Sequence, residues 1–363
     1  MTQALSMLID AYRELNHRKL FWVTLGISGL VVAAFAMIGN NAEGLTILHW
    51  SIDAPLLSTQ IISTADFYKL VFSLLGVQYW LGWFATILAI ISTASIFPDF
   101  IGSGSIDLLL SKPIGRMRLF LTKFLTGLLF VTLQVTIFTI AAILVIGIRG
   151  GEWVPWLLIS VPLMVLFYSY LFCVQAVVGM ITRSAIASII AVLLFWMLCF
   201  GLQFADQITL SGRVVYEIQV ERTERRLERQ VKMLELAEPD ELEERQDRVM
   251  KIGGELEEDK ASLGTWITVN RWIHLGNTLL PKTGETSGLL LRILEDKADL
   301  SDLRDDEPER MMFGVSVSPQ ELEKRMAEAI DDDHSWVWII GTSLLFEAFV
   351  LGLGGWWFVR RDF

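Results

Sequence analysis

Residues 119–148 read LFLTKFLTGLLFVTLQVTIFTIAAILVIGI, a run in which Lys123 is the only charged side chain. About 20 consecutive apolar residues are enough to cross a bilayer as a helix, so this run is long enough to span a membrane. Five further runs have the same character: residues 20–39, 67–97, 154–181, 185–204 and 336–359. The chain is 53% hydrophobic, with a mean hydropathy of +0.49. The sequence therefore predicts an all-α polytopic membrane protein with six transmembrane helices.

Charge is distributed unevenly along the chain. The formal net charge is −11, yet residues 205–334 alone hold 18 Lys/Arg and 31 Asp/Glu. The remainder is therefore slightly basic, which is typical of a membrane body with an acidic soluble insert between its fifth and sixth helices. This acidity argues against nucleic acid as a partner.

The short loops predict the orientation of the helices. Cations gather at residues 17–19, at 112–123, at Arg183 and at residues 360–361, whereas residues 40–66 contain no Lys or Arg. With six spans, all of these cations fall on one side, which the positive-inside rule assigns to the cytoplasm. The turn at Arg149 is the exception. We expect a multi-pass protein with both termini in the cytoplasm.

The chain divides into four predicted regions. Residues 1–19 have apolar side chains at helical spacing and predict a cytoplasmic amphipathic helix in the membrane interface, or else a tail packed on a soluble partner. Residues 20–204 hold transmembrane helices 1–5, with 40–66 as a polar loop. Residues 205–334 predict an extracytoplasmic helical hairpin that turns at Pro239, with a further helix starting at Pro319. Residues 335–363 hold the sixth span and a cytoplasmic C-terminus.

The loop between the second and third spans has a pattern of its own. Gly104-Ser105 can start a short helix, residues 106–110 give it an apolar face, and Pro113 ends it. Together with the cations that follow, this pattern predicts a cytoplasmic helix, near residues 103–112, that inserts into a soluble partner. A re-entrant or interfacial loop without a partner is the alternative.

This loop resembles the one between spans two and three of ABC-2 type transporter permeases, especially the multicopper-enzyme-maturation group of nitrous oxide reductase accessory permeases. The residues that carry the resemblance are Asp99, Gly104, Ser105, Leu109, Leu110, Ser111, Pro113, Ile114, Arg116 and Lys123. The six spans and the C-terminal Trp356-Trp357-Phe358-Val359-Arg360-Arg361-Asp362-Phe363 are also similar to that family. Asp99 stands where the family often has Glu, Ser105 stands where it often has Thr, and the insert is unusually large.

The resemblance implies the membrane subunit of a transporter in the bacterial inner membrane, present as a homodimer or heterodimer of permease copies. It implies that a separate dimeric ATPase subunit binds ATP and Mg²⁺, and that it docks on this chain's loop helix. The implied coupling residues are Asp99, Gly104, Ser105, Ile106, Asp107, Leu108, Leu109, Leu110, Pro113, Arg116 and Lys123. The membrane lipid and an extracytoplasmic partner of residues 205–334 are further expected contacts.

The sequence contains no catalytic motif that we recognise. It has no G-x-x-x-x-G-K-[ST] phosphate loop and no H-E-x-x-H, and its four histidines are scattered. We therefore expect no enzymatic activity, no metal and no cofactor in this chain. Cys173 and Cys199 lie within hydrophobic runs and are expected to be buried small apolar residues.

Glu347 stands out because it lies near the middle of the sixth span, where a carboxylate must face protein or water. It either makes a structural hydrogen bond to a neighbouring span, for example through Gln134 or Gln175, or lines a translocation path and couples its gating. Two other functions remain open. The chain could be a membrane anchor or signalling protein whose hairpin recruits a partner, or an intramembrane enzyme that uses Glu347.

Overall fold

The computed structural model describes residues 19–54, 57–102, 115–289, 309–333 and 336–361. The predicted interfacial helix of residues 1–19 falls almost entirely outside these ranges. The chain forms two compact units: unit 1 comprises residues 1–198, 281–300 and 340–363, and unit 2 comprises residues 199–280 and 301–339. Helices α9 (Ala185–Glu235) and α13 (Trp336–Arg360) each contribute to both units.

All six predicted spans are helical. Within the described part of the chain, six helices are long and apolar enough to cross a membrane, which supports a polytopic membrane protein. They are Lys19–Met37, Thr64–Gly102, Arg116–Gly150, Pro155–Thr182, Ala185–Glu235 and Trp336–Arg360.

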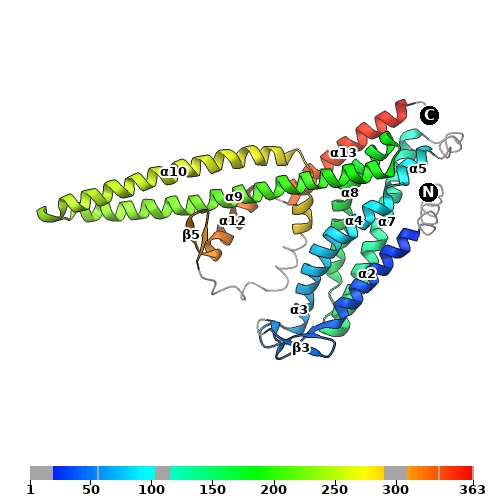
Figure 1. The fold of residues 1–363 in the computed structure, drawn as a ribbon, viewed down its shortest axis with the longest axis horizontal. Coiled ribbons are helices and arrows are strands. Elements are labelled where there is room, and N and C mark those ends of the chain that lie inside the picture. Colours follow the sequence, from blue (N-terminus) through cyan, green and yellow to red (C-terminus); the bar gives the residue numbers. More distant parts are fainter. Residues whose placement is uncertain (1–18, 55–56, 103–114, 290–308, 334–335, 362–363) are drawn as a thin grey trace. The chain divides into compact units, whose positions relative to one another are not determined.

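Unit 1 is a helical bundle built around α7 (Arg116–Val145) and α8 (Ser160–Thr182), which pack along each other (Figure 1). Helix α2 (Lys19–Met37) packs on α7, and the second span lies against both α7 and α8. This second span consists of α3 (Thr64–Val71), the π-helix η2 (Phe72–Ala85), α4 (Thr86–Thr93) and α5 (Ile96–Gly102). The π-helix η3 (Ile146–Gly150) and the 3-10 helix η4 (Pro155–Ile159) form the turn between α7 and α8.

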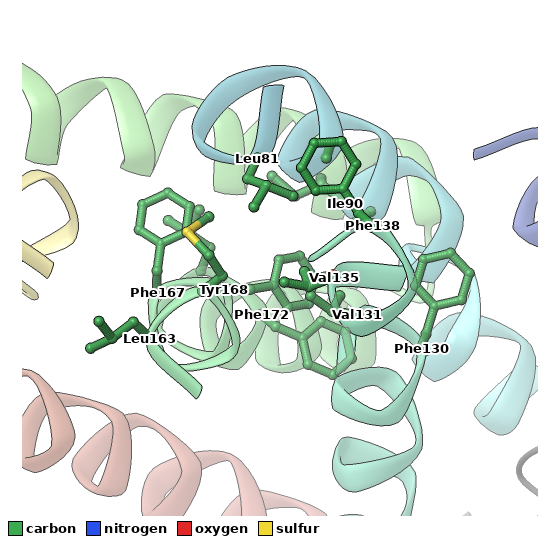
Figure 2. Close-up of a cluster of buried hydrophobic side chains, with 14 of the residues drawn as sticks. Leu81, Ile90, Phe130, Val131, Val135, Phe138, Leu163, Phe167, Tyr168 and Phe172 are labelled. Carbon is green, nitrogen blue, oxygen red and sulfur yellow. The ribbon is translucent and has the colours of Figure 1, made fainter. Parts of the chain in front are cut away.

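The core of unit 1 is rich in aromatic side chains. Phe172 of α8 stacks on Phe124 of α7, with 5.1 Å between ring centroids, and on Tyr168 at 5.6 Å. Figure 2 shows this region, in which Val135 and Phe138 of α7 lie toward Leu81 and Ile90 of the second span. Gly127 lets the two helices approach closely, because a Cβ atom there would overlap the ring of Phe172.

The loop after α2 is more ordered than the sequence indicated. Three strands, β1 (Ile38–Asn40), β2 (Gly44–Ile47) and β3 (Trp50–Asp53), form an antiparallel sheet in that order. The register pairs Leu45 with both Asn40 and Ile52. Gly44 has φ +141°, and a Cβ atom there would collide with the backbone of Ala54, so the turn requires glycine.

The turn after α7 is tied to this sheet and to α3 by polar contacts. Arg149 Nε donates to the Tyr68 hydroxyl at 2.9 Å, and that hydroxyl donates to the carbonyl of Ile38 at 2.7 Å. Lys69 Nζ lies 2.9 Å from Asp66 and 2.8 Å from Glu152. Arg149, the cation that departs from the charge rule, therefore has a structural partner.

Unit 2 contains the predicted helical hairpin. Helix α9 runs without a break from the fifth span to Glu235, and α10 (Leu242–Thr278) returns antiparallel to it after the 3-10 turn η5 (Pro239–Glu241) (Figure 1). Thr223 Oγ1 donates to Asp259 at 2.9 Å, and Lys260 Nζ lies 3.0 Å from Glu224. Residues 185–278 thus form two long helices with a turn at Pro239 between them.

A small αβ element completes unit 2. Strands β4 (Arg310–Met312) and β5 (Val315–Val317) form a hairpin, and α12 (Pro319–Asp333) begins at the predicted proline. Val315 and Val317 pack with Val214 and Ile218 of α9 in a second apolar core.

Candidate functional site

The predicted coupling loop is described only at its two ends. Gly104, Ser105, Ile106, Asp107, Leu108, Leu109, Leu110 and Pro113 lie outside the described residues. Asp99 is exposed in α5, and Arg116 and Lys123 lie in the first turns of α7. The structure therefore describes the two helices that flank the loop and what those helices contact.

Arg116 joins the start of α7 to the end of α13. Its Nη1 donates to the carbonyl of Arg361 at 2.8 Å and to the carbonyl of Val359 at 3.2 Å. The last carbonyls of a helix lack partners within the helix and carry partial negative charge, so a guanidinium is well suited to bind them. Arg116 therefore caps the C-terminal end of α13.

Phe358 reinforces this junction. The side chain is fully buried, and its ring centroid lies 5.9 Å from that of Phe100 in α5 and 6.2 Å from that of Phe120 in α7. Lys123 Nζ lies 5.8 Å from the centroid of Phe100. The end of α13 thus packs against both helices that flank residues 103–114. We call these contacts of Arg116 and Phe358 the α13 junction.

Glu347 lies further along α13 and is buried, with 8% of its surface exposed. Ser169 Oγ of α8 donates to Glu347 Oε2 at 2.8 Å. The Tyr170 hydroxyl lies beside Thr286 and Ser343 and near the Glu347 carboxylate. The carboxylate therefore faces protein.

A segment that follows α10 in the chain completes this group. Lys282, Thr283 and Thr286 are almost fully buried. The backbone N–H of Lys282 donates to Ser343 Oγ of α13 at 2.9 Å, and Thr286 Oγ1 donates to the carbonyl of Lys282 at 2.7 Å. We call Ser169, Tyr170, Lys282, Thr286, Ser343 and Glu347 the Glu347 cluster.

Sequence reasoning missed most of this cluster. Lys282 is one of many charges in the acidic insert, and no local pattern in the sequence distinguishes it from the others. The alternation of Lys282 and Glu285 with threonines, in a stretch free of large apolar side chains, is typical of a solvated turn rather than of a buried segment. The structure nevertheless buries Lys282 completely.

Glu347 has a hydrogen bond to a neighbouring span, as in its first interpretation, but the partner is Ser169 rather than Gln134 or Gln175. Gln175 Nε2 donates to the carbonyl of Ile90 at 2.6 Å, while Ser169 is the donor to Glu347. Ser169 and Gln175 are six residues apart on α8, so they lie on different faces of that helix.

Gln134 has a different environment. It is buried in α7, and neither atom of its amide group has a hydrogen-bond partner among the described residues. The two glutamines lie near the same polar residues. Gln134 lines a small cavity together with Tyr168. Tyr168 is hydrogen-bonded to Thr93, whose Oγ1 lies 3.4 Å from Gln175 Oε1.

Metal-ligand clusters are not found in the described part of the chain. Cys173 and Cys199 are both buried, as expected from their place in hydrophobic runs. His274 contacts Asp206 at 3.4 Å and stacks on Trp338 within unit 2, far in sequence from the other described histidine, His49.

Comparison with known proteins finds one family model, and that family has no known function. A family model described as a protein of unknown function, DUF2705, matches residues 30–204, less than half of the chain. This match covers the membrane helices from α2 into α9 and both described flanks of the coupling loop. No curated protein and no solved structure matches the chain.

Proposed function

We propose that this chain is the membrane-embedded permease subunit of an ABC transporter of the ABC-2 type. In this proposal a separate dimeric ATPase subunit binds ATP and Mg²⁺, and residues 103–112 dock on it. The chain works with a second permease copy in the cytoplasmic membrane of a bacterium, with both termini in the cytoplasm. ATP hydrolysis then drives export, or mechanical work on the outer side.

The α13 junction is the observation that best supports this proposal. An ATPase that moves the loop must move α5 and the start of α7, because these helices flank it. Arg116 and Phe358 tie both helices to the end of α13. A displacement of the loop would therefore reach α13 directly.

Helix α13 can carry this displacement to the Glu347 cluster. An α-helix rises 1.5 Å per residue and is stiff, so residues at its two ends move together. Ser343 and Glu347 lie one turn apart on α13, and they contact residues 282 and 169. We propose that movement of α13 loosens the buried segment around Lys282 and so opens the outer side of the permease.

The hairpin of unit 2 would respond to this movement because its helix α10 is joined to the Lys282 segment along the chain. The Lys282 segment follows α10 after only a few residues, so its release would free the C-terminal end of that helix. In this proposal residues 205–334 gate the substrate or engage an extracytoplasmic partner.

Co-purification from native membranes tests the proposal. Affinity-tagged protein is expected to retain a subunit whose sequence contains G-x-x-x-x-G-K-[ST], and deletion of residues 106–110 is expected to abolish this association. If the full-length protein retains no such ATPase, or if the deletion leaves the association intact, the permease assignment fails. Recovery of an extracytoplasmic protein alone would instead favour an anchor or assembly role for the hairpin.

A further inference from the structure

Gln134 poses a problem that the permease proposal does not address. It is 2% exposed, and both Oε1 and Nε2 lack a hydrogen-bond partner among the described residues. Its helix is one of the six candidate membrane spans. An amide without a partner is costly in an apolar interior, and buried polar groups in proteins are nearly always hydrogen-bonded to protein or to bound water.

A cavity lies beside Gln134, where α7 meets the second span and α8. Its volume is about 10 Å³, which is roughly the space that one water molecule needs. Most of its wall is apolar, including Leu81, Val131 and Val135, which surround Tyr168 in Figure 2. Thr86, Gln134 and Tyr168 are the polar residues that line it.

The hydroxyl protons of Thr86 and Tyr168 are already used. Thr86 Oγ1 donates to the carbonyl of Leu81 at 2.8 Å. Thr93 Oγ1 lies 2.8 Å from the carbonyl of Ala89, its best acceptor, so the 2.6 Å contact between Thr93 and Tyr168 is assigned to donation by Tyr168. Both hydroxyl oxygens therefore keep lone pairs that can accept, while Gln134 Nε2 has protons to donate.

We propose that this cavity is a binding site for a single water molecule. The water accepts a hydrogen bond from Gln134 Nε2 and donates to the hydroxyl oxygens of Thr86 and Tyr168. Three hydrogen bonds are the usual number for a buried water in a protein. The cavity is too small for a larger ligand, and its neutral lining offers no countercharge to an ion.

The bound water would join three spans in the middle of the bundle. Thr86 is the first residue of α4, directly after the π-helix η2, and π-helical segments are frequent at functional sites. Beyond Tyr168 lies Thr93, whose Oγ1 is 3.4 Å from Gln175 Oε1, and Gln175 Nε2 donates to the carbonyl of Ile90. This inference is independent of the ATPase partner and of transport.

Radiolytic labelling in bilayer nanodiscs tests the inference, because X-ray pulses generate hydroxyl radicals from bound water inside a protein. Met164 lines the cavity and is 2% exposed. Met180, on the same helix and 0% exposed, is the matched control because it does not line the cavity. We expect millisecond pulses to oxidise Met164 and to spare Met180. No oxidation of Met164, or equal oxidation of both, would overturn the proposal.

The variant Gln134→Leu removes the amide that holds the water and fills part of the cavity. We expect Met164 oxidation to be lost in this variant, with Met180 unchanged. Persistent oxidation of Met164 would show that Gln134 does not hold a water there. The measurement on the unsubstituted protein decides the question on its own if this variant does not fold.

Discussion

Ser169 and Glu347 form a buried hydrogen bond between two spans, which makes each residue dependent on the other. Ser169 Oγ lies 2.8 Å from Glu347 Oε2, and Tyr170 lies near the same carboxylate. A buried carboxylate that loses a donor has no water to replace it, whereas removing both members of such a pair is often nearly neutral. The energetic link between the two residues can therefore be measured directly.

We expect Ser169→Ala to lower the stability of the purified protein by about 1–3 kcal/mol, because it leaves Glu347 without its donor. Thermal unfolding in detergent gives the comparison. In a Glu347→Leu background the same substitution should cost much less, since no carboxylate remains to be satisfied. Equal costs in both backgrounds would mean that the two side chains do not interact.

At the scale of the elements, α7 and α8 approach closely at Gly127. We expect Gly127→Ala to destabilise the protein by about 1–3 kcal/mol, because the added methyl overlaps Phe172 and forces overpacking. Gly26→Ala in α2 is the matched control, because nothing lies within 4 Å of a Cβ atom there. The packing of α7 on α8 would be contradicted if both variants unfolded at the temperature of the native protein.

The α13 junction is a second element-scale feature. We expect Arg116→Ala to fray the end of α13, because two carbonyls lose their donor, and trypsin should then cut after Arg360 and Arg361 more rapidly. Arg118→Ala is the matched control, because Arg118 lies in the same helical turn and its side chain has no described partner. Equal cleavage rates in the two variants would show that Arg116 does not hold this end.

The sequence predicted helices well where their length and apolarity decide the outcome, and less well elsewhere. The six spans depend on hydropathy alone and were all found. Helix α9 continues from the fifth span into the hairpin through residues 205–213, which contain no proline, and Gly212 lies against Trp266. The strands of residues 38–53 are too short for a reliable alternating pattern.

The candidate site was predictable only in part, because its residues come together from distant parts of the chain. A carboxylate inside an apolar span marks Glu347 in the sequence alone. Its donor Ser169 lies 178 positions away, and the Lys282 segment belongs to the acidic insert. Such pairings depend on tertiary packing, which leaves no periodic signal in one sequence.

At the scale of the whole molecule, the orientation in the membrane can be tested on intact cells. We expect the variant Glu241→Cys, at the exposed turn of the hairpin, to react with a membrane-impermeant maleimide added outside. A C-terminal cysteine tag should react only after the membrane is permeabilised. The native protein is the control, because both of its cysteines are buried. The reverse pattern would place the hairpin in the cytoplasm and contradict the proposed topology.

The central claim is that ATP in the cytoplasm opens the buried segment around Lys282 through α13. The variant Thr283→Cys tests it, because Thr283 is 1% exposed and cysteine has a similar size. The partly exposed Ser287→Cys is the matched control, because it should react in either state. In the complex with its ATPase, we predict that ATP accelerates maleimide labelling of Thr283→Cys severalfold, that Ser287→Cys is unaffected, and that adding Arg116→Ala removes the acceleration. Labelling of Thr283→Cys at the same rate with and without ATP would contradict the account.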